Sequence, residues 1–172
     1  MNRHVILVGL SGAGKTTVGR LAAARSPLLF PEFADLDELI QLEAGRPIAE
    51  IFARAGEAEF RRLERAAMAR ALARPPHLIA AGAGWIAAPG NLDAARARGA
   101  LTVYLRIDPE LAARRLAGDA SRPLLAGDDR AARLRSLLEA RQAAYGQASA
   151  ALDASGPLEE VVASLVAILE AA

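Results

Sequence analysis

The chain of 172 residues contains no cysteine and a single lysine, Lys15, against 20 arginines. The absence of cysteine excludes a disulfide-stabilised scaffold and a zinc site built on thiolates. The net charge is +1 with the two signs interspersed, which disfavours a broad basic surface for nucleic acid. The longest uncharged run, residues 78–92, is interrupted by three glycines and a proline and falls short of the roughly 20 apolar residues of a spanning helix. We therefore expect a cytoplasmic protein that binds neither nucleic acid nor membrane.

The length fits one domain, and short apolar segments alternate with helical segments along it. We predict strands at 5–9, 28–33, 78–81, 101–107 and 150–153, with helices at 16–24, 36–43, 48–54, 57–74, 91–98, from 109, at 130–145 and at 158–169. Asn91 is expected to cap its helix, and Asp108 to cap a helix with Pro109 in first position. Such alternation predicts an α/β fold with a central five-stranded parallel sheet flanked by helices.

A glycine-rich segment joins the first predicted strand to the first predicted helix. Residues 9–16 read Gly-Leu-Ser-Gly-Ala-Gly-Lys-Thr and match the pattern G-x-x-x-x-G-K-[ST]. Glycines let the backbone turn its amides around a polyphosphate, and the following helix adds partial positive charge at its N-terminus. The lysine can reach the terminal phosphates, and the threonine hydroxyl can bind Mg²⁺. This motif predicts nucleotide binding without identifying the reaction.

Two carboxylates, Asp35 and Asp37, follow the second predicted strand. The carboxyl ends of strands border the ligand crevice in an open α/β sheet. One carboxylate there could hold the water shell of Mg²⁺ while the other acts on an acceptor hydroxyl. The alternative is that either of them only caps the next helix.

Further motifs follow in a fixed order: Gly56-Glu57-x-x-Phe60-Arg61-x-x-Glu64, a glycine turn at Gly82–Gly84, Arg122-Pro123-Leu124-Leu125, and Arg141 with Tyr145 one helical turn later. Taken singly, each of these arginines is more often a solvated surface charge. Taken together with the phosphate loop and Asp35-x-Asp37, the motifs resemble the shikimate kinase family. The resemblance runs through most of the chain, and the Gly56–Glu64 block is far more specific than the phosphate loop.

The resemblance implies a three-layer P-loop kinase fold that uses ATP and Mg²⁺ to phosphorylate the 3-hydroxyl of shikimate, or of a similar hydroxy acid, in the pathway to aromatic amino acids. Nucleotide contacts are implied for Gly12, Ala13, Gly14, Lys15, Thr16, Thr17, Arg115 and Arg122. Acceptor contacts are implied for Asp37, Arg61, Gly82, Ala83, Gly84 and Arg141, with the two arginines on the carboxylate. Lys15, Asp37 and Arg122 are implied to be catalytic, Asp37 as the base, and Thr16 and Asp35 to hold the metal. A single domain, 1–172, would carry acceptor-binding helices at 36–73 and a mobile lid at 116–129, and would act as a monomer.

The sequence departs from the family pattern around the acceptor. Gly82-Ala83-Gly84 stands where the family has three glycines, and a positive φ at the middle position would strain alanine. Trp85 follows directly, either as an aromatic that packs in the core or under the lid, or as a wall that reshapes the acceptor pocket. Residues 153–157 lack an arginine often found near the adenine, and no proline separates Arg141 from Tyr145. These departures leave the phosphoryl-transfer groups intact.

Three alternatives to shikimate phosphorylation remain open from the sequence. One is a related kinase for another carboxylated polyol, such as gluconate. Another is a nucleotide-binding module of this type without turnover. An adenylate-type kinase fits less well, because the Arg61 block and the short lid do not favour a second nucleotide.

Overall fold

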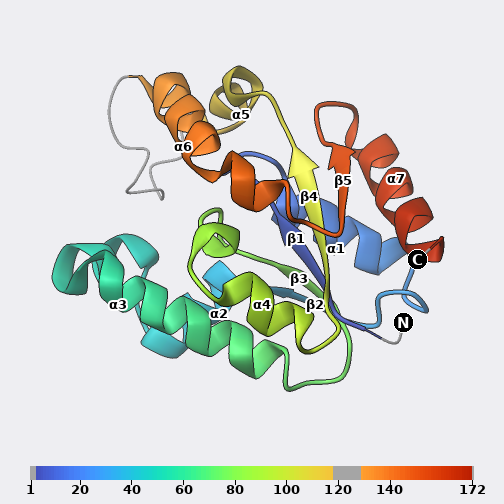
Figure 1. The fold of residues 1–172 in the computed structure, drawn as a ribbon, viewed down its shortest axis with the longest axis horizontal. Coiled ribbons are helices and arrows are strands. Elements are labelled where there is room, and N and C mark those ends of the chain that lie inside the picture. Colours follow the sequence, from blue (N-terminus) through green and yellow to red (C-terminus); the bar gives the residue numbers. More distant parts are fainter. Residues whose placement is uncertain (1–2, 118–128, 172) are drawn as a thin grey trace.

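Four consecutive apolar residues form the central strand β1 (Val5–Val8), and none of them is more than 1% exposed. Such burial on both faces requires helices above and below the strand. The computed structural model describes residues 3–117 and 129–171, and it supplies those helices in a three-layer α/β arrangement (Figure 1). The other elements, in chain order, are α1 (Lys15–Arg25), β2 (Phe33–Asp35), α2 (Leu36–Ala44), α3 (Ile48–Ala71), β3 (Leu78–Ala80), the short 3₁₀ helix η1 (Trp85–Ala87), α4 (Asn91–Arg96), β4 (Leu101–Arg106), α5 (Pro109–Arg115), α6 (Arg130–Tyr145), β5 (Ala150–Asp153) and α7 (Leu158–Glu170).

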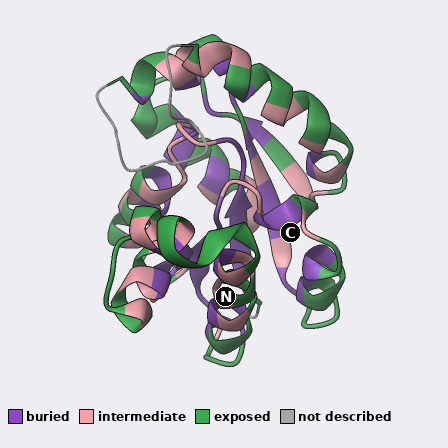
Figure 2. Ribbon diagram, turned by 90° about the vertical axis from the view of Figure 1, so that its left-hand side faces the viewer, coloured by how far each residue is buried: buried purple, intermediate pink, exposed green. Residues whose placement is uncertain are grey.

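All five strands are parallel, in the order β2-β3-β1-β4-β5, which confirms the predicted sheet. The connection from β1 to β2 and those from β3 onward run in opposite directions across the sheet. Right-handed crossovers therefore place α1 on one face and α3, α4 and α6 on the other. Helix α7 returns to the face of α1 and packs beside it (Figure 1). Buried residues follow the strands and the helix faces turned toward them, whereas the outer helix faces are exposed (Figure 2).

The second strand lies later in the chain than predicted. Residues 28–33 were expected to form it, but Leu28 is 96% exposed and the strand is Phe33–Asp35, paired from Phe33 with Leu78. Pro31 has no N–H to donate to a ladder, and the chain before it turns with Leu29 N and Phe30 N donating to Ser26 O. The shift matters for the site, because the strand ends on Asp35 and α2 follows without a loop.

Three predictions about where helices begin or break can be compared with the structure, and two of them are confirmed. The predicted break between helices 48–54 and 57–74 is confirmed, because Gly56 has φ 76° and ψ 178° inside the segment assigned to α3. The predicted cap at Asn91 is wrong. Gly90, with φ 79°, occupies the cap position, and Asn91 instead donates from Nδ2 to Trp85 O at 2.8 Å. Asp108 does cap α5, accepting from Glu110 N and Leu111 N. Within residues 3–117 and 129–171, no helix is both long and apolar enough to cross a bilayer.

Candidate active site

The loop between β1 and α1 wraps back over the carboxyl end of the sheet. Gly12 and Gly14 have φ of 84° and 85°, a region that a side chain disfavours. A Cβ on Gly12 would lie 2.7 Å from Ala112 O, so the loop also packs too closely on α5 for any other residue. Helix α1 opens on Gly14 without a side-chain cap, and its first N–H groups lack intrahelical partners. This is the backbone arrangement that the sequence motif predicts for an anion site.

Lys15 is held inside this loop. Its Nζ donates to Gly9 O at 2.9 Å and to Leu10 O at 3.0 Å. The ammonium is thereby fixed over the concave side of the loop, where residues from the loop, α1 and β2 line a cavity. The predicted nucleotide residues Gly12, Gly14, Lys15, Thr16, Thr17 and Arg115 all line this cavity, whereas Ala13 is almost completely buried and lines an adjoining cavity together with Arg115.

Thr16 and Asp35 meet at the floor of the same cavity. Thr16 Oγ1 donates to Asp35 Oδ2 at 2.5 Å. The other carboxylate oxygen of Asp35 caps α2, accepting from Asp37 N at 2.9 Å and from Glu38 N at 3.3 Å. The capping alternative therefore holds for Asp35 without displacing it from the site, and Asp37 is left to extend from the first turn of α2.

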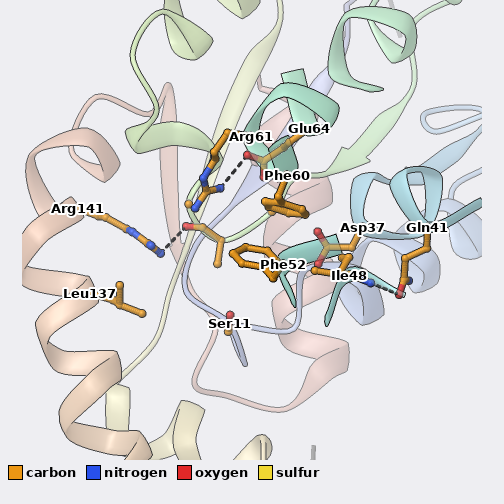
Figure 3. A pocket seen from close by; sticks show the side chains of 13 residues that line it. Ser11, Asp37, Gln41, Ile48, Phe52, Phe60, Arg61, Glu64, Leu137 and Arg141 are labelled. Carbon is orange, nitrogen blue, oxygen red and sulfur yellow. Dashed lines mark hydrogen bonds and ion pairs between the residues drawn. The ribbon is translucent and has the colours of Figure 1, made fainter. Parts of the chain in front are cut away.

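A second pocket opens beside the first and shares Ser11 and Asp37 with it (Figure 3). One side is apolar, where Phe52 and Phe60 lie with ring centroids 4.8 Å apart. The polar side carries Arg61 from α3 and Arg141 from α6, which reach it from two helices far apart in the sequence (Figure 3). The remaining lining residues are Gln41, Ile48, Glu64, Gly82, Ala83, Gly84 and Leu137.

Arg61 is anchored by two carboxylates of its own helix. Its guanidinium donates to Glu64 Oε2 at 2.9 Å and to Glu57 Oε1 at 3.0 Å. Burial disfavours its charge, yet these two carboxylates outweigh burial and the pKa of Arg61 is raised. The pKa of Glu64 is also raised, chiefly because the group is buried, with Arg61 opposing the shift. Glu64 belongs to the motif quoted from the sequence, but its position against the pocket could not be read there.

The glycine turn after β3 fits around these charged groups. A Cβ on Gly82 would lie 2.2 Å from Glu64 Oε1, and one on Gly84 would lie 2.6 Å from Arg61 Nη2. Ala83 between them is not strained, because no residue other than glycine has a positive φ in the described part of the chain. The strain considered for an alanine here is therefore absent. A methyl group at either end of the turn would displace the Glu64 carboxylate or the Arg61 guanidinium, whereas the middle position accommodates one.

Ala83 presents its carbonyl to α6. Arg141 Nη1 donates to it at 3.2 Å and Tyr145 Oη at 2.8 Å. Trp85, next in the chain, is 1% exposed and does not line the acceptor pocket. It lies instead with Met68 and Leu72 between α3 and α4. Of the two interpretations of Trp85, the core aromatic is the one that the structure supports.

Arg115 lines the phosphate cavity and does not line the pocket that holds Arg61. Its guanidinium donates to Ala154 O at 2.9 Å and to Ser155 O at 3.3 Å, which ties α5 to the chain after β5. A further cavity, lined by Arg115, Gly156 and Leu158 among others, adjoins the phosphate loop there. Arg122 and most of the predicted lid, 116–129, lie outside the described residues.

Several pocket residues escaped the sequence reasoning. Phe52, Phe60, Ile48 and Leu137 were indistinguishable from core positions, since an apolar residue at helical spacing carries no sign of which cavity it faces. Gln41 lines the pocket and ties α2 to α3 by accepting from Ile48 N at 3.2 Å. Only the kink at Gly56, visible as a glycine between helical segments, hinted that α3 bends around a cavity.

Comparison with known proteins agrees with this geometry. The family described as "Shikimate kinase" matches residues 11–170. The shikimate kinase of Caldanaerobacter subterraneus subsp. tengcongensis is 38% identical over 164 residues, covering 95% of this chain and 94% of that protein. That of Symbiobacterium thermophilum is 43% identical over 148 residues, covering 85% and 83%. The structure of Acinetobacter baumannii shikimate kinase in complex with shikimate superposes with a TM-score of 0.91 at 31% identity, covering 98% of this chain and 93% of that one.

The family match includes all the lining residues of both cavities, and it contains every motif that carried the resemblance except the first two residues of the phosphate loop, Gly9 and Leu10. The chain belongs to the shikimate kinase family.

Proposed function

We propose that the chain transfers the γ-phosphoryl group of ATP to the 3-hydroxyl of shikimate, giving shikimate 3-phosphate and ADP in aromatic amino acid biosynthesis. The observation that carries this proposal is the position of Asp37, which lines both the phosphate cavity and the pocket that holds Arg61 and Arg141. A hydroxyl beside Asp37 therefore faces the phosphate loop while a carboxylate on the same molecule faces the two arginines. Shikimate carries both groups on one small ring.

The transfer needs few chemical groups from the protein. Asp37 would accept the proton of the acceptor hydroxyl while the hydroxyl oxygen forms a bond to the γ-phosphorus. The bond from that phosphorus to the β–γ bridging oxygen would break at the same time and release ADP. Lys15 and the amides from Gly12 to Thr17 would stabilise the charge on the phosphoryl oxygens, since positioning and electrostatics dominate this chemistry. Arg115 and Arg122 are proposed to contact the nucleotide. Arg61, Arg141 and the turn Gly82–Gly84 are proposed to hold the acceptor.

The Thr16–Asp35 pair suits a magnesium ion. Its donor set is one hydroxyl and one carboxylate, and Mg²⁺ prefers a few such oxygens and fills its other positions with water and substrate phosphates. Accordingly, no cluster of three metal-binding side chains is needed, and residues 3–117 and 129–171 contain none. When bound, the ion would supply charge neutralisation between the phosphates.

A coupled assay of ADP release with shikimate as acceptor tests the proposal. We expect turnover with shikimate, and Arg61→Ala and Arg141→Ala are each expected to raise the KM for shikimate while leaving the KM for ATP unchanged. Turnover with gluconate and none with shikimate would overturn the acceptor assignment. ATP binding without turnover on any hydroxy acid of the panel would identify a nucleotide-binding module instead.

We further propose that the protein acts as a cytoplasmic monomer. Both cavities are lined by residues of one chain, so the described part of the site needs no second copy. ATP as donor supports a location inside the cell. Light scattering on the eluted protein measures the mass directly, and a dimer of stable mass would contradict the proposed state.

A further inference from the structure

The carbonyl of Ala83 is a shared hydrogen-bond acceptor at the edge of the acceptor pocket. A carbonyl oxygen has two lone pairs, and here both have donors, Arg141 Nη1 at 3.2 Å and Tyr145 Oη at 2.8 Å. The two donors come from the same face of α6, one helical turn apart. They differ in what else they can reach, because Arg141 lines the pocket and Tyr145 does not.

Tyr145 is the fixed member of this pair. Its side chain is buried, and its ring stacks on that of Tyr104 from β4, with centroids 4.5 Å apart and planes 3° from parallel. Burial also raises the pKa of Tyr145 to about 12, so its hydroxyl keeps its proton and remains a donor. The phenol therefore joins the sheet to the acceptor turn through a short hydrogen bond that no bound molecule needs to disturb.

Arg141 is the exchangeable member. Its hydrogen bond to a neutral carbonyl is the longer of the two, and a carboxylate entering the pocket offers a stronger, charge-assisted bond. Turning toward that carboxylate removes one donor from Ala83 O. A partly buried carbonyl left with no protein donor would cost free energy, which would oppose the movement of Arg141.

We propose that Tyr145 is a positioning residue whose hydroxyl holds the Ala83 carbonyl while Arg141 transfers from that carbonyl to the carboxylate of the acceptor. The hydroxyl keeps the turn Gly82–Gly84 in place against Arg61 and Glu64 during the exchange. This role rests on the proposed function, since it requires an acceptor with a carboxylate. It acts on binding of the acceptor and has no part in the transfer of the phosphoryl group.

Tyr145→Phe tests the role, because it removes the hydroxyl and keeps the stacked ring. We expect the KM for shikimate to rise by about three- to tenfold, which corresponds to the net contribution of the one hydrogen bond that is lost. The KM for ATP and the kcat at saturating shikimate should stay unchanged. Tyr104→Phe is the matched control: its ring is the other half of the stack, and no hydrogen bond of its hydroxyl is found among the described contacts. That variant is expected to behave as the unmodified protein.

A neutral acceptor separates positioning from general structural damage. Shikimate methyl ester lacks the charge that draws Arg141 away from Ala83, so Tyr145→Phe should leave its KM unchanged. An equal rise in KM for the acid and the ester, or no rise for the acid, would overturn the proposal. The KM for the acid divided by the KM for the ester is obtained from one preparation of each protein. A comparison of this ratio between Tyr145→Phe and the unmodified protein therefore remains valid if the variant is less stable.

Failure of the proposed function would look different. In that case the unmodified protein would not turn shikimate over, whatever residue 145 is. Calorimetric titration of the acid and the ester without ATP then tests the positioning role on its own. Weaker binding of the acid alone by Tyr145→Phe supports it, and equal binding by both proteins overturns it.

Discussion

Lys15 is the single ammonium side chain in a chain with 20 arginines, and its geometry explains why arginine does not replace it. Nζ fits between two carbonyls of its own loop, at 2.9 Å and 3.0 Å, within the concave side that faces the phosphate cavity. A compact, freely rotating donor fits this space, whereas the planar guanidinium is broader and its donors point in fixed directions.

Lys15→Arg is therefore expected to abolish transfer although it keeps the charge. We expect kcat to fall by at least about a hundredfold, as when one charge-stabilising donor is removed from an active site. The coupled ADP assay measures the loss, and Arg62→Lys, an exposed exchange on α3, serves as the control. Near-normal turnover of Lys15→Arg would mean that the loop does not select for an ammonium.

Glu64 is fully buried, which is unusual for a carboxylate in a protein core. Oε2 is bound by Arg61, whereas Oε1 has no hydrogen-bond partner among the described residues and lies beside Gly82. Its raised pKa reflects the cost of burying this charge. The ion pair with Arg61 offsets part of this cost, and it fixes the guanidinium at the edge of the acceptor pocket.

Glu64→Gln keeps the shape of the side chain and removes its charge. Arg61 then loses its buried counter-charge and keeps only the more exposed Glu57, so its guanidinium is held less firmly. We expect the KM for shikimate to rise about tenfold, with the KM for ATP unchanged. Glu57→Gln, which alters the exposed partner, should give the smaller rise, and the reverse order would contradict this account.

Among the helices and strands, the sequence correctly predicted those features that follow from hydrophobic periodicity and from glycine or proline positions. Strand β1 follows from an uninterrupted apolar run, and the kink at Gly56 follows from a glycine between two helical patterns. The predicted position of β2, 28–33, was wrong, because Pro31 cannot donate to the ladder and pairing begins only at Phe33. The close approach of Glu64 and Arg61 to the glycine turn could not be predicted, since it depends on α3 and β3 meeting in three dimensions.

The close approach of Arg61 to the turn Gly82–Gly84 can be tested by substitutions in that turn. A methyl group on Gly84 would lie 2.6 Å from Arg61 Nη2, so Gly84→Ala should displace the guanidinium and raise the KM for shikimate about tenfold. Ala83→Gly should change neither kcat nor KM, because Ala83 has no positive φ to relieve. Steady-state kinetics with shikimate measures both variants. A gain of activity in Ala83→Gly would show instead that the methyl group limits use of the acceptor.

In the whole molecule, the candidate active site and a pair of buried histidines lie at opposite ends of the parallel strands. The parallel strands bring the phosphate loop, Asp35 and the glycine turn to their carboxyl ends. At the opposite ends of β1 and β3 lie His4 and His77, both buried, with ring centroids 5.0 Å apart and edge to face. His77 Nδ1 donates to Pro75 O at 2.8 Å, and His77 N donates to His4 Nδ1 at 3.4 Å. The second contact requires an unprotonated Nδ1 on His4, and therefore a neutral His4 ring.

Acidification should therefore destabilise the fold from the edge remote from the site. Burial first, and the neighbouring His77 second, lower the pKa of His4 below its ordinary value of 6.5. The unfolded chain then binds a proton before the folded one does as pH falls. The stability contributed by neutral His4 is present above pH 6.5 and is lost as pH falls through its folded pKa.

Urea unfolding of the unmodified protein and of His4→Gln at a series of pH values from 8 to 5 tests this linkage. All other titrating groups are common to the two proteins, so the difference between their free energies of unfolding isolates His4. We expect the advantage of the unmodified protein to shrink below pH 6.5, because glutamine has no proton to gain. A constant difference across the series would mean that His4 titrates alike in both states, and that burial at this end of the sheet does not control the charge of the histidine.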